Sequence, residues 1–306
     1  MAVRFCSFAV VDYLPAFWSL TMRLLSLIVA LLWLKLGVAL GKANANSLDP
    51  QSTAKLIQIV NQVKTEKLSP STLQAISVAF LGAKYQGGLL DRSLTEQLFV
   101  SLSEFDCVLF VETVLAIAQS VKQVQANNSS TIVNDFPSQI ASLRYRHGVI
   151  DGYCSRLHYF TDWIQDNQKR GKVTDITQEL GGIVDRNSLN FMTENRKSYR
   201  QLANDQSLYE CIKAREQELA KTPRFYIPTS QITRIYSRLQ AGDIIAIATT
   251  VKGLDVTHTG LVFIQGNHIG LIHASPDGAV KISPDLASYV SAVPDSKGIV
   301  VARPNL

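Results

Sequence analysis

A stripe of apolar residues at helical spacing follows Cys107. Apolar side chains recur 3, 4, 7, 8 and 11 positions after it, at Phe110, Val111, Val114, Leu115 and Ala118. This spacing predicts a helix that buries one face, with Cys107 in its first turn on the buried side. Asp106 is a favourable N-cap, and a helix N-terminus favours thiolate over thiol through its N–H groups and its dipole. Cys107 is therefore a candidate nucleophile; the alternative is a cysteine that fills space in the core.

The remaining hydrophobic pattern divides the chain into a helical first part and a stranded second part. Helical spacing is found over 49–64 and 70–81, and a glycine-rich loop follows at 82–88. We expect a mostly helical and irregular stretch over about 135–224. Short β-branched runs bounded by Gly, Asn and Asp then predict strands at 239–248, 257–264, 269–275 and 298–303. Helices followed by an antiparallel sheet of short strands indicate an α+β fold.

The first 45 residues have the pattern of a secretory signal peptide. An apolar run from Leu24 to Leu34 leads to the A-x-A site Ala43-Asn44-Ala45, which predicts cleavage after Ala45. Met22-Arg23 directly precedes the run, and Met22 is the alternative start of the protein. We therefore expect residues 1–45 to be removed and residues 46–306 to form a single exported domain, in the periplasm or outside the cell. The alternative is an uncleaved membrane anchor, although the run is short for a spanning helix.

Composition indicates a globular protein. Hydrophobic residues make up 46% of the chain and charged residues 18%, which is compatible with a sizeable core. The net charge is +5, but the predicted signal segment has four basic residues and one acid, so 5 − (4 − 1) leaves only about +2 for the rest. This excess is too small to indicate a nucleic-acid partner. After signal cleavage we also expect no stable membrane association.

Cysteine usage fits an exported chain that keeps a free thiol. Signal cleavage would remove Cys6 and leave Cys107, Cys154 and Cys211, an odd number, so at least one thiol would stay unpaired in an oxidising compartment. We interpret Cys154 as structural and Cys211 as a core residue on a helical face.

Two histidines are candidates for the base that a thiolate nucleophile needs. His258 begins one predicted strand and His273 ends the next, so a turn through Gly266 and Asn267 could bring the two side by side. The chain has no H-E-x-x-H and no paired C-x-x-C spacing, so a zinc hydrolase is not indicated. We expect neither a metal nor a cofactor.

Arg, His, Tyr and Trp are concentrated between two glycine turns in the central part of the chain. Guanidinium groups and aromatic faces suit a ligand with carboxylates and sugar rings. The alternative is a loop that its aromatic residues anchor to the core. The candidate substrate-binding residues of this segment are Arg144, Tyr145, Ser155, Arg156, His158 and Tyr159.

Several of these segments together resemble a known superfamily, the NlpC-type papain-like cysteine peptidases, which act on bacterial cell-wall peptides. The matching segments, in order, are the glycine-rich loop around Tyr85, Phe105-Asp106-Cys107, Gly242-Asp243, His258-Thr259-Gly260 and Ile272-His273-Ala274. The central segments resemble one branch, the N-acetylmuramoyl-L-alanine amidase-like family; they are Arg144-Tyr145-Arg146-x-Gly148, Asp151 to Trp163, Phe191-Met192 and Tyr226-Ile227-Pro228.

This resemblance implies a papain-like fold, with N-terminal helices that carry the nucleophile packed on a short-stranded sheet and with a large helical or irregular insertion. Cys107 would be the nucleophile, His258 the base and His273 the residue that orients it. Tyr85 matches a loop tyrosine of these relatives whose hydroxyl would stabilise the oxyanion; the alternative is a packing aromatic. Many relatives have Ser-Gly after the cysteine, whereas this chain has Val108 and Leu109, so contacts beside the nucleophile can differ.

The function that the resemblance implies is hydrolysis of the amide between N-acetylmuramic acid and L-alanine, in peptidoglycan or in muropeptide fragments, through a thioester. Two alternatives stay open at this point. One is a γ-D-glutamyl endopeptidase that cleaves within the stem peptide. The other is a non-catalytic module that binds peptidoglycan.

Overall fold

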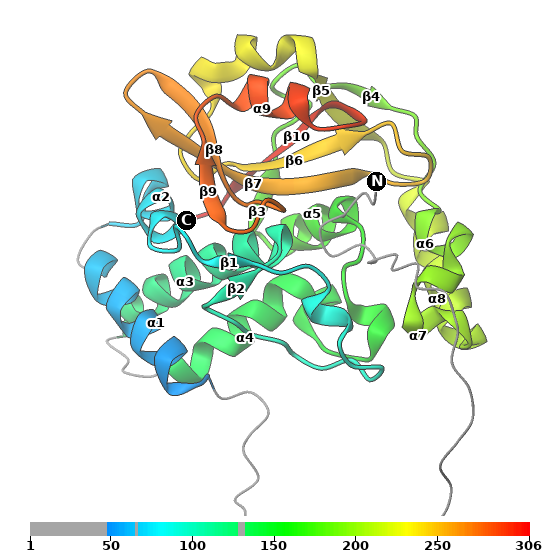
Figure 1. Ribbon diagram of the computed structural model, residues 1–306, viewed down its shortest axis with the longest axis horizontal. Helices are drawn as coiled ribbons and strands as arrows, with labels where there is room; N and C mark the ends of the chain where they lie inside the picture. The colour runs from blue at the N-terminus through cyan, green and yellow to red at the C-terminus, as the bar shows by residue number, and fades with distance from the viewer. Residues whose placement is uncertain (1–47, 65–66, 128–131) are drawn as a thin grey trace, which may run out of the picture.

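A computed structural model describes residues 48–64, 67–127 and 132–306 of the chain. The predicted signal segment, the cleavage site and the alternative start at Met22 lie outside the described residues. Within them, eight strands form one antiparallel sheet, and helices cover both of its faces (Figure 1). The α+β expectation and the antiparallel sheet are confirmed.

The strand order of the sheet is β4-β5-β10-β6-β7-β8-β9, and β3 also pairs with β10. The strands of this sheet are β3 (Val173–Asp175), β4 (Ile183–Asp185), β5 (Arg224–Pro228), β6 (Ile244–Thr249), β7 (Val256–Gln265), β8 (His268–Ala274), β9 (Val280–Ser283) and β10 (Ser296–Pro304). A separate parallel pair is formed by β1 (Lys84–Tyr85) and β2 (Glu104–Phe105). The four predicted strands correspond to β6, β7, β8 and β10, whereas β3, β4, β5 and β9 were not predicted.

The helices form a large layer on one face of the sheet and a smaller one on the other (Figure 1). They are α1 (Pro50–Val63), α2 (Pro70–Val78), α3 (Cys107–Asn127), α4 (Ile132–Arg144), α5 (Phe160–Lys169), α6 (Phe191–Glu194), α7 (Arg200–Ala203), α8 (Gln206–Leu219) and α9 (Leu286–Ala292). Short 3₁₀ segments include η3 (Tyr153–Ser155) and η5 (Thr229–Arg238). The predicted helices before the glycine-rich loop are α1 and α2, and both begin with proline after a polar cap.

Side chains of β6 alternate between two cores. Ile244 and Ala246 belong to the core with α3, and Ile245 and Ile247 belong to the core that α9 and η5 cover. This alternation is the two-residue period of a strand that is buried on both faces. The sheet therefore has a thick helical layer on one face and a thin one on the other.

Helix α3 is the centre of the larger core. The predicted stripe from Phe110 to Ala118 is buried throughout, and the ring of Phe110 lies edge-on to those of Phe80 and Phe105. Among the described residues, α3 is the one helix long and apolar enough to span a membrane, but most of it is buried inside the protein. Its hydrophobicity is explained by its position between α1, α2 and α4 and the strands β7 and β8.

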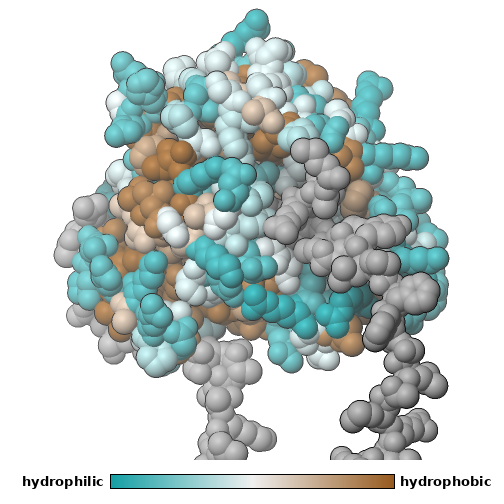
Figure 2. All heavy atoms as spheres, in the orientation of Figure 1, coloured by the Kyte–Doolittle hydropathy of each residue, from teal (hydrophilic) through white to brown (hydrophobic). Residues whose placement is uncertain are grey.

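Polar side chains cover most of the face drawn in Figure 2, with smaller apolar areas between them. The exposed large apolar side chains are spread over several elements, for example Val78 and Leu81 at α2 and Ile183 and Val184 on β4. This distribution is that of an ordinary globular surface.

The predicted turn between the two histidine-bearing strands is confirmed. Strands β7 and β8 pair from Leu261 opposite Ile272 to Gln265 opposite His268, so Gly266 and Asn267 form the two-residue connection. Gly266 has φ +59°, the left-handed conformation that such tight turns need. The register of this hairpin determines how the histidines face each other.

Candidate active site

Cys107 is the first residue of α3, as predicted. The side chain of Asp106 accepts a hydrogen bond from the Leu109 N–H at 2.8 Å, and its carbonyl accepts one from the Phe110 N–H at 3.1 Å, so Asp106 is the N-cap. Cys107 is buried. In this structure it is disulfide-bonded. A role as nucleophile requires its reduced form.

His258 and His273 are in direct contact. The Nε2 atom of His258 lies 2.7 Å from Nδ1 of His273, and the two rings are nearly perpendicular. Since Nε2 of His258 is engaged in this contact, Nδ1 is the nitrogen that could accept a proton from a thiol. This is the arrangement expected of a base and the group that orients it.

The register of β7 against β6 determines which face of the sheet carries His258, and a β-bulge directly precedes this residue. Ile247 pairs with His258, but the next residue of β6, Ala248, pairs with Val256, so Thr257 is an extra residue. The bulge reverses the alternation of side chains, so Val256 and His258 lie on opposite faces. Because His258 pairs with Ile247, it lies on the face covered by α9, and it meets His273 there.

Gly260 explains how the two histidines can touch. It lies opposite His273, where a Cβ atom would come 2.8 Å from Cβ of His273 and 2.9 Å from the carbonyl oxygen of Ile272. His258 and His273 are diagonal neighbours across the two strands, a separation that long side chains can bridge. Without a side chain at position 260, the His273 ring can lean across to His258. This is the physical reason for the glycine in His258-Thr259-Gly260.

Both imidazoles are held neutral. Burial, followed by the neighbouring His273, keeps the pKa of His258 well below its usual value. Burial and, to a smaller extent, Lys281 lower the pKa of His273 to about 4, against the raising effect of Asp277. At neutral pH the pair therefore carries no charge, and His258 can act as a base.

Two further residues contact His273 that the sequence did not indicate. The hydroxyl of Ser283, at the end of β9, lies 3.1 Å from its Nε2. The hydroxyl of Tyr289, on α9, lies 3.4 Å from its Nδ1, and the two rings are 4.6 Å apart. Serine and tyrosine in a strand end and a short helix carry no sequence signal of their own, so only the three-dimensional arrangement identifies them.

Tyr85 lies between the cysteine and the histidines. Its strand β1 pairs with β2, where Tyr85 is opposite Phe105, two residues before Cys107. Its backbone N–H bonds to the carbonyl of Gly278 at 2.8 Å, in the loop that follows β8. The pKa of Tyr289 is raised by burial, by Asp277 and also by Tyr85, so Tyr85 is near that side chain as well. The glycine-rich loop thus connects both parts of the site.

The structure brings His258 and His273 directly together and places Tyr85 beside the segment that leads into Cys107. Cys107 itself belongs to the core on the α3 face, whereas the histidines lie on the α9 face. The two parts meet at the end of β8, where the loop after this strand is bonded to the glycine-rich loop. Among the described residues, no group of three or more His, Cys, Asp or Glu side chains could hold a metal ion.

Three predicted substrate-binding residues have their polar groups occupied inside the protein. Arg144 forms a buried ion pair with Glu112 at 2.8 Å. The hydroxyls of Tyr145 and Tyr159 donate to Glu96 at 2.7 Å and to Glu216 at 2.6 Å. All three side chains are almost fully buried, which gives each a structural role, and the prediction that Arg144, Tyr145 and Tyr159 line the substrate cleft stays a prediction. Their partners are distant in sequence, which is why the pattern of Arg and Tyr was ambiguous.

The other three candidates also contact protein. Ser155 closes its own turn by donating to the Gly152 carbonyl at 2.8 Å. Arg156 donates to Asp91 at 2.8 Å and lies over the ring of Tyr153, and His158 contacts the Tyr153 carbonyl through Nε2 at 2.8 Å. Each therefore has a structural role, and substrate binding by Ser155, Arg156 and His158 stays a prediction.

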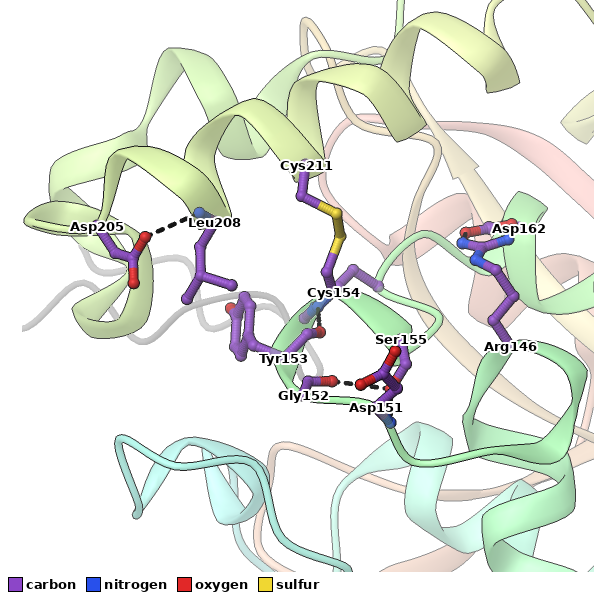
Figure 3. Close-up of a disulfide and its surroundings, with 11 residues drawn as sticks. Arg146, Asp151, Gly152, Tyr153, Cys154, Ser155, Asp162, Asp205, Leu208 and Cys211 are labelled. Carbon is purple, nitrogen blue, oxygen red and sulfur yellow. Dashed lines mark hydrogen bonds and ion pairs between the residues drawn. A yellow bond between two sulfur atoms is a disulfide. The ribbon is translucent and has the colours of Figure 1, made fainter.

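Cys154 and Cys211 form a disulfide that the sequence did not predict (Figure 3). It joins η3 to α8 across 57 residues, with the two Cα atoms 6.3 Å apart. The structural role expected for Cys154 agrees with this bond. The interpretation of Cys211 as a core residue is wrong, because its sulfur is half of the bond.

The Gly242-Asp243 segment is structural as well. Gly242 has φ +80° and lies so close to α2 that a Cβ atom would come 2.6 Å from Leu73. Asp243 accepts two hydrogen bonds from Arg303, each of 2.8 Å. This bidentate pair fixes the start of β6 against β10.

Comparisons with known proteins identify a family and similar structures. A family model described as N-acetylmuramoyl-L-alanine amidase-like (AmiA-like) matches residues 75–299. Among solved structures, the chain is similar to an N-acetylmuramoyl-L-alanine amidase from Bacteroides uniformis, with 31% identity and a TM-score of 0.71 over 78% of this chain and 99% of that one. No curated protein matches the chain.

Two further structures are similar. A Bacteroides fragilis protein described as a candidate xylanase has 30% identity and a TM-score of 0.66, over 75% of this chain and 99% of that one. A Legionella pneumophila protein has 22% identity and a TM-score of 0.63, over 84% of this chain and 95% of that one. At this identity, the similarity to the Legionella pneumophila protein supports only the fold.

Proposed function

The chain belongs to the N-acetylmuramoyl-L-alanine amidase-like family, and on this premise we propose that it hydrolyses the amide between N-acetylmuramic acid and L-alanine with Cys107 as nucleophile. The substrate would be peptidoglycan or muropeptide fragments. We further propose that the chain is a member of the NlpC-type papain-like cysteine peptidase superfamily and has its fold. The observation that carries the mechanism is the 2.7 Å contact between His258 and His273, because a thiol nucleophile needs an oriented base.

The proposed reaction has two halves. The thiol of reduced Cys107 gives its proton to Nδ1 of His258, and the sulfur attacks the lactyl carbonyl of the muramic acid. The tetrahedral intermediate collapses when His258 returns the proton to the nitrogen of L-alanine, which leaves as the amino terminus of the stem peptide. Water, deprotonated by His258, then hydrolyses the thioester and regenerates the thiol.

Stabilisation of the oxyanion is assigned to two donors. The backbone N–H of Cys107 at the start of α3 is the first, and the hydroxyl of Tyr85 is the second. In support of the second, β1 places Tyr85 opposite Phe105, next to the start of α3. Two donors aimed at the developing charge are typical of acyl transfer.

Glycoside hydrolysis, which the description of the Bacteroides fragilis protein would imply, is less well supported. Glycosidases use two carboxyl groups that face each other across the sugar bond. The polar groups gathered at this site are two imidazoles, a serine and two tyrosines, beside a cysteine at a helix end, and the carboxyl group near them, that of Asp277, is paired with Lys281. This set suits acyl transfer through a thioester.

We also propose that the chain is exported, to the periplasm or the cell exterior. The disulfide between Cys154 and Cys211 supports this proposal, because disulfides persist in oxidising compartments and are rare in the cytosol. Signal cleavage after Ala45 and the absence of a membrane anchor afterwards are part of the same proposal.

Mass spectrometry of products from a purified muropeptide tests the function. The protein is incubated with and without a reductant, since the mechanism needs the thiol of Cys107. We expect an intact stem peptide with a free L-alanine amino group together with the stem-free disaccharide. Shortened stems would instead establish the endopeptidase, and binding without any product under reducing conditions would favour the non-catalytic module.

A serine substitution tests the nucleophile. Cys107→Ser keeps the shape of the side chain but offers a much poorer nucleophile, so turnover should be lost. Cys154→Ser is the matched control and should keep turning over substrate at a temperature where it is folded. If the kcat of Cys107→Ser stayed within about tenfold of that of the unmodified protein, a difference of roughly 1.4 kcal/mol in the activation barrier, Cys107 would not be the nucleophile.

A further inference from the structure

Ser283 occupies the side of His273 that faces away from His258. It is the last residue of β9 and pairs with Leu271, which places it diagonally across from His273. Its hydroxyl lies 3.1 Å from Nε2 of His273, while Nδ1 of the same ring contacts His258 at 2.7 Å. Both nitrogens of His273 are therefore engaged, in a row that runs from Ser283 to His258.

Two proton arrangements are compatible with these distances. In the first, Nε2–H of His258 donates to Nδ1 of His273, and Nε2–H of His273 donates to the hydroxyl oxygen of Ser283. In the second, every bond is reversed: Ser283 donates to His273, and His273 donates through Nδ1–H to His258. Only the first leaves a lone pair on Nδ1 of His258, because in the second this nitrogen carries the proton.

The choice between these tautomers matters because the rings are buried and neutral. His273 has no exposed surface, and burial together with Lys281 keeps its pKa low against the opposing effect of Asp277. A neutral imidazole has one donor and one acceptor nitrogen, so the partner of one nitrogen decides the role of the other. An N–H left without an acceptor in such a place is unfavourable.

Tyr289 gives a second indication of the same arrangement. Its hydroxyl is 3.4 Å from Nδ1 of His273. Burial and the nearby charge of Asp277 raise the pKa of Tyr289, so the phenol stays protonated and can donate. Two potential donors, His258 and Tyr289, thus face Nδ1 of His273, and the hydroxyl of Ser283 faces Nε2. This distribution fits Nδ1 as acceptor.

We propose that Ser283 is a positioning residue that holds His273 as its Nε2–H tautomer and thereby keeps Nδ1 of His258 able to accept a proton. The link to catalysis rests on the proposed function, in which that proton comes from Cys107. The tautomer itself does not depend on the reaction. Ser283 acts through His273 and does not touch the thiol in this scheme.

Ring ¹⁵N NMR of histidine-labelled protein tests the tautomer directly, because protonated and bare ring nitrogens have very different chemical shifts. The measurement uses Cys107→Ser, in which no thiolate can charge His258, and a His273→Gln variant identifies the His273 signals. We expect a bare Nδ1 and a protonated Nε2 on His273. A protonated Nδ1 on His273 in this protein would overturn the proposal without any assay of activity.

Substitutions at position 283 extend the test. Ser283→Ala should replace the single tautomer by a mixture and, in the protein with Cys107 intact, lower kcat by about tenfold with KM little changed. Ser283→Thr keeps the hydroxyl and should restore both the single tautomer of His273 and the kcat of the unmodified protein. Ser291→Ala is the control, since it removes an exposed hydroxyl of α9 that bonds only to the Ala287 carbonyl among described contacts.

The outcomes separate this inference from the proposed function. If Ser283→Ala leaves both the His273 spectrum and kcat unchanged, Ser283 is not a positioning residue. If the expected tautomer is found and Ser283→Ala perturbs it, the inference holds even when no muropeptide is cleaved. In that case only the proposed function fails.

Discussion

Gly260 of β7 lies against His273 of β8 so closely that a Cβ atom at position 260 would sit 2.8 Å from Cβ of His273. Real Cβ atoms do not approach one another so closely, and the neighbouring contact, to the Ile272 carbonyl at 2.9 Å, is backbone that cannot move alone. A side chain here must therefore push β8 away or displace the His273 ring.

Gly260→Ala should lower both stability and kcat. Overpacking of this kind costs about 1–3 kcal/mol of unfolding free energy, and displacement of His273 should lower kcat by at least about tenfold. Chemical denaturation gives the first quantity and muropeptide turnover the second. A loss of stability with an unchanged kcat would show that the His258–His273 contact tolerates movement of the strands.

Tyr85→Phe removes the hydroxyl and keeps the ring. If this hydroxyl stabilises the oxyanion, kcat should fall by about 10²- to 10³-fold with little change in ground-state binding. Tyr209→Phe on α8 is the control, because Tyr209 lies on the insertion and stacks on Arg196. A decrease in kcat of less than about threefold for Tyr85→Phe would assign Tyr85 to packing alone.

Loss of the disulfide should affect stability and leave catalysis intact. The bond between Cys154 and Cys211 closes a loop with a sequence separation of 57, and opening a loop of this size costs about 2–4 kcal/mol. Cys154→Ser, Cys211→Ser and the double variant should be destabilised equally in thermal unfolding and should keep kcat at low temperature. If the double variant were much less stable than either single variant, each cysteine side chain would contribute to stability on its own as well as through the bond.

Arg144→Met should lower the free energy of unfolding by about 3–5 kcal/mol, because it leaves the buried carboxylate of Glu112 without its ion-pair partner. Both side chains of this pair are nearly inaccessible, at 3% and 1% exposure. The double variant Arg144→Met with Glu112→Leu should recover much of the loss, as measured by urea denaturation. A raised KM without loss of stability would instead show that Arg144 binds substrate in the cleft.

Acidification should destabilise the protein through its buried histidines. The unfolded chain binds a proton on His273 below pH 6.5, but the folded protein does so only near pH 4. Between these values the unfolded state binds more protons, so the free energy of unfolding falls as the pH falls. For His273 the full effect is about 3 kcal/mol at 1.36 kcal/mol per pKa unit.

His273→Gln isolates this contribution. Its unfolding free energy should depend less steeply on pH between about 6.5 and 4 than that of the unmodified protein. The buried acids Glu96, Glu112, Glu216 and Asp255 have pKa values raised by burial and act in the opposite direction, but they are present in both proteins. Equal slopes would show that His273 is not held neutral.

Features with a local signal were predicted well from the sequence. The N-cap at Asp106, the stripe of α3 and the two-residue turn at Gly266 and Asn267 each depend on residues within a few positions of one another. The pairing of His258 with His273 followed from that turn. The detailed geometry of this pairing could not be predicted, because the bulge at Thr257 arises from the register between β6 and β7, and the sequence of a single strand does not reveal that register.

Features that depend on distant partners were missed or misinterpreted. The buried acids that bind Arg144, Tyr145 and Tyr159 lie 32, 49 and 57 positions away in the sequence. The same holds for Cys154 with Cys211. Nor could the hydropathy pattern place Ser283 and Tyr289 beside His273, because a hydroxyl is equally common on a solvent-exposed surface.

The short hairpin that carries the histidines also bears on how the active protein is made. His258 and His273 are 15 residues apart, so the chain loses little entropy when it closes the loop between them. Cys107 lies roughly 150 positions earlier in the sequence, and its helix reaches β7 and β8 only through contacts of high sequence separation, which form slowly. During folding the histidine pair can thus exist without Cys107 beside it. If the proposed function holds, catalysis has to wait until the two halves of the chain have docked.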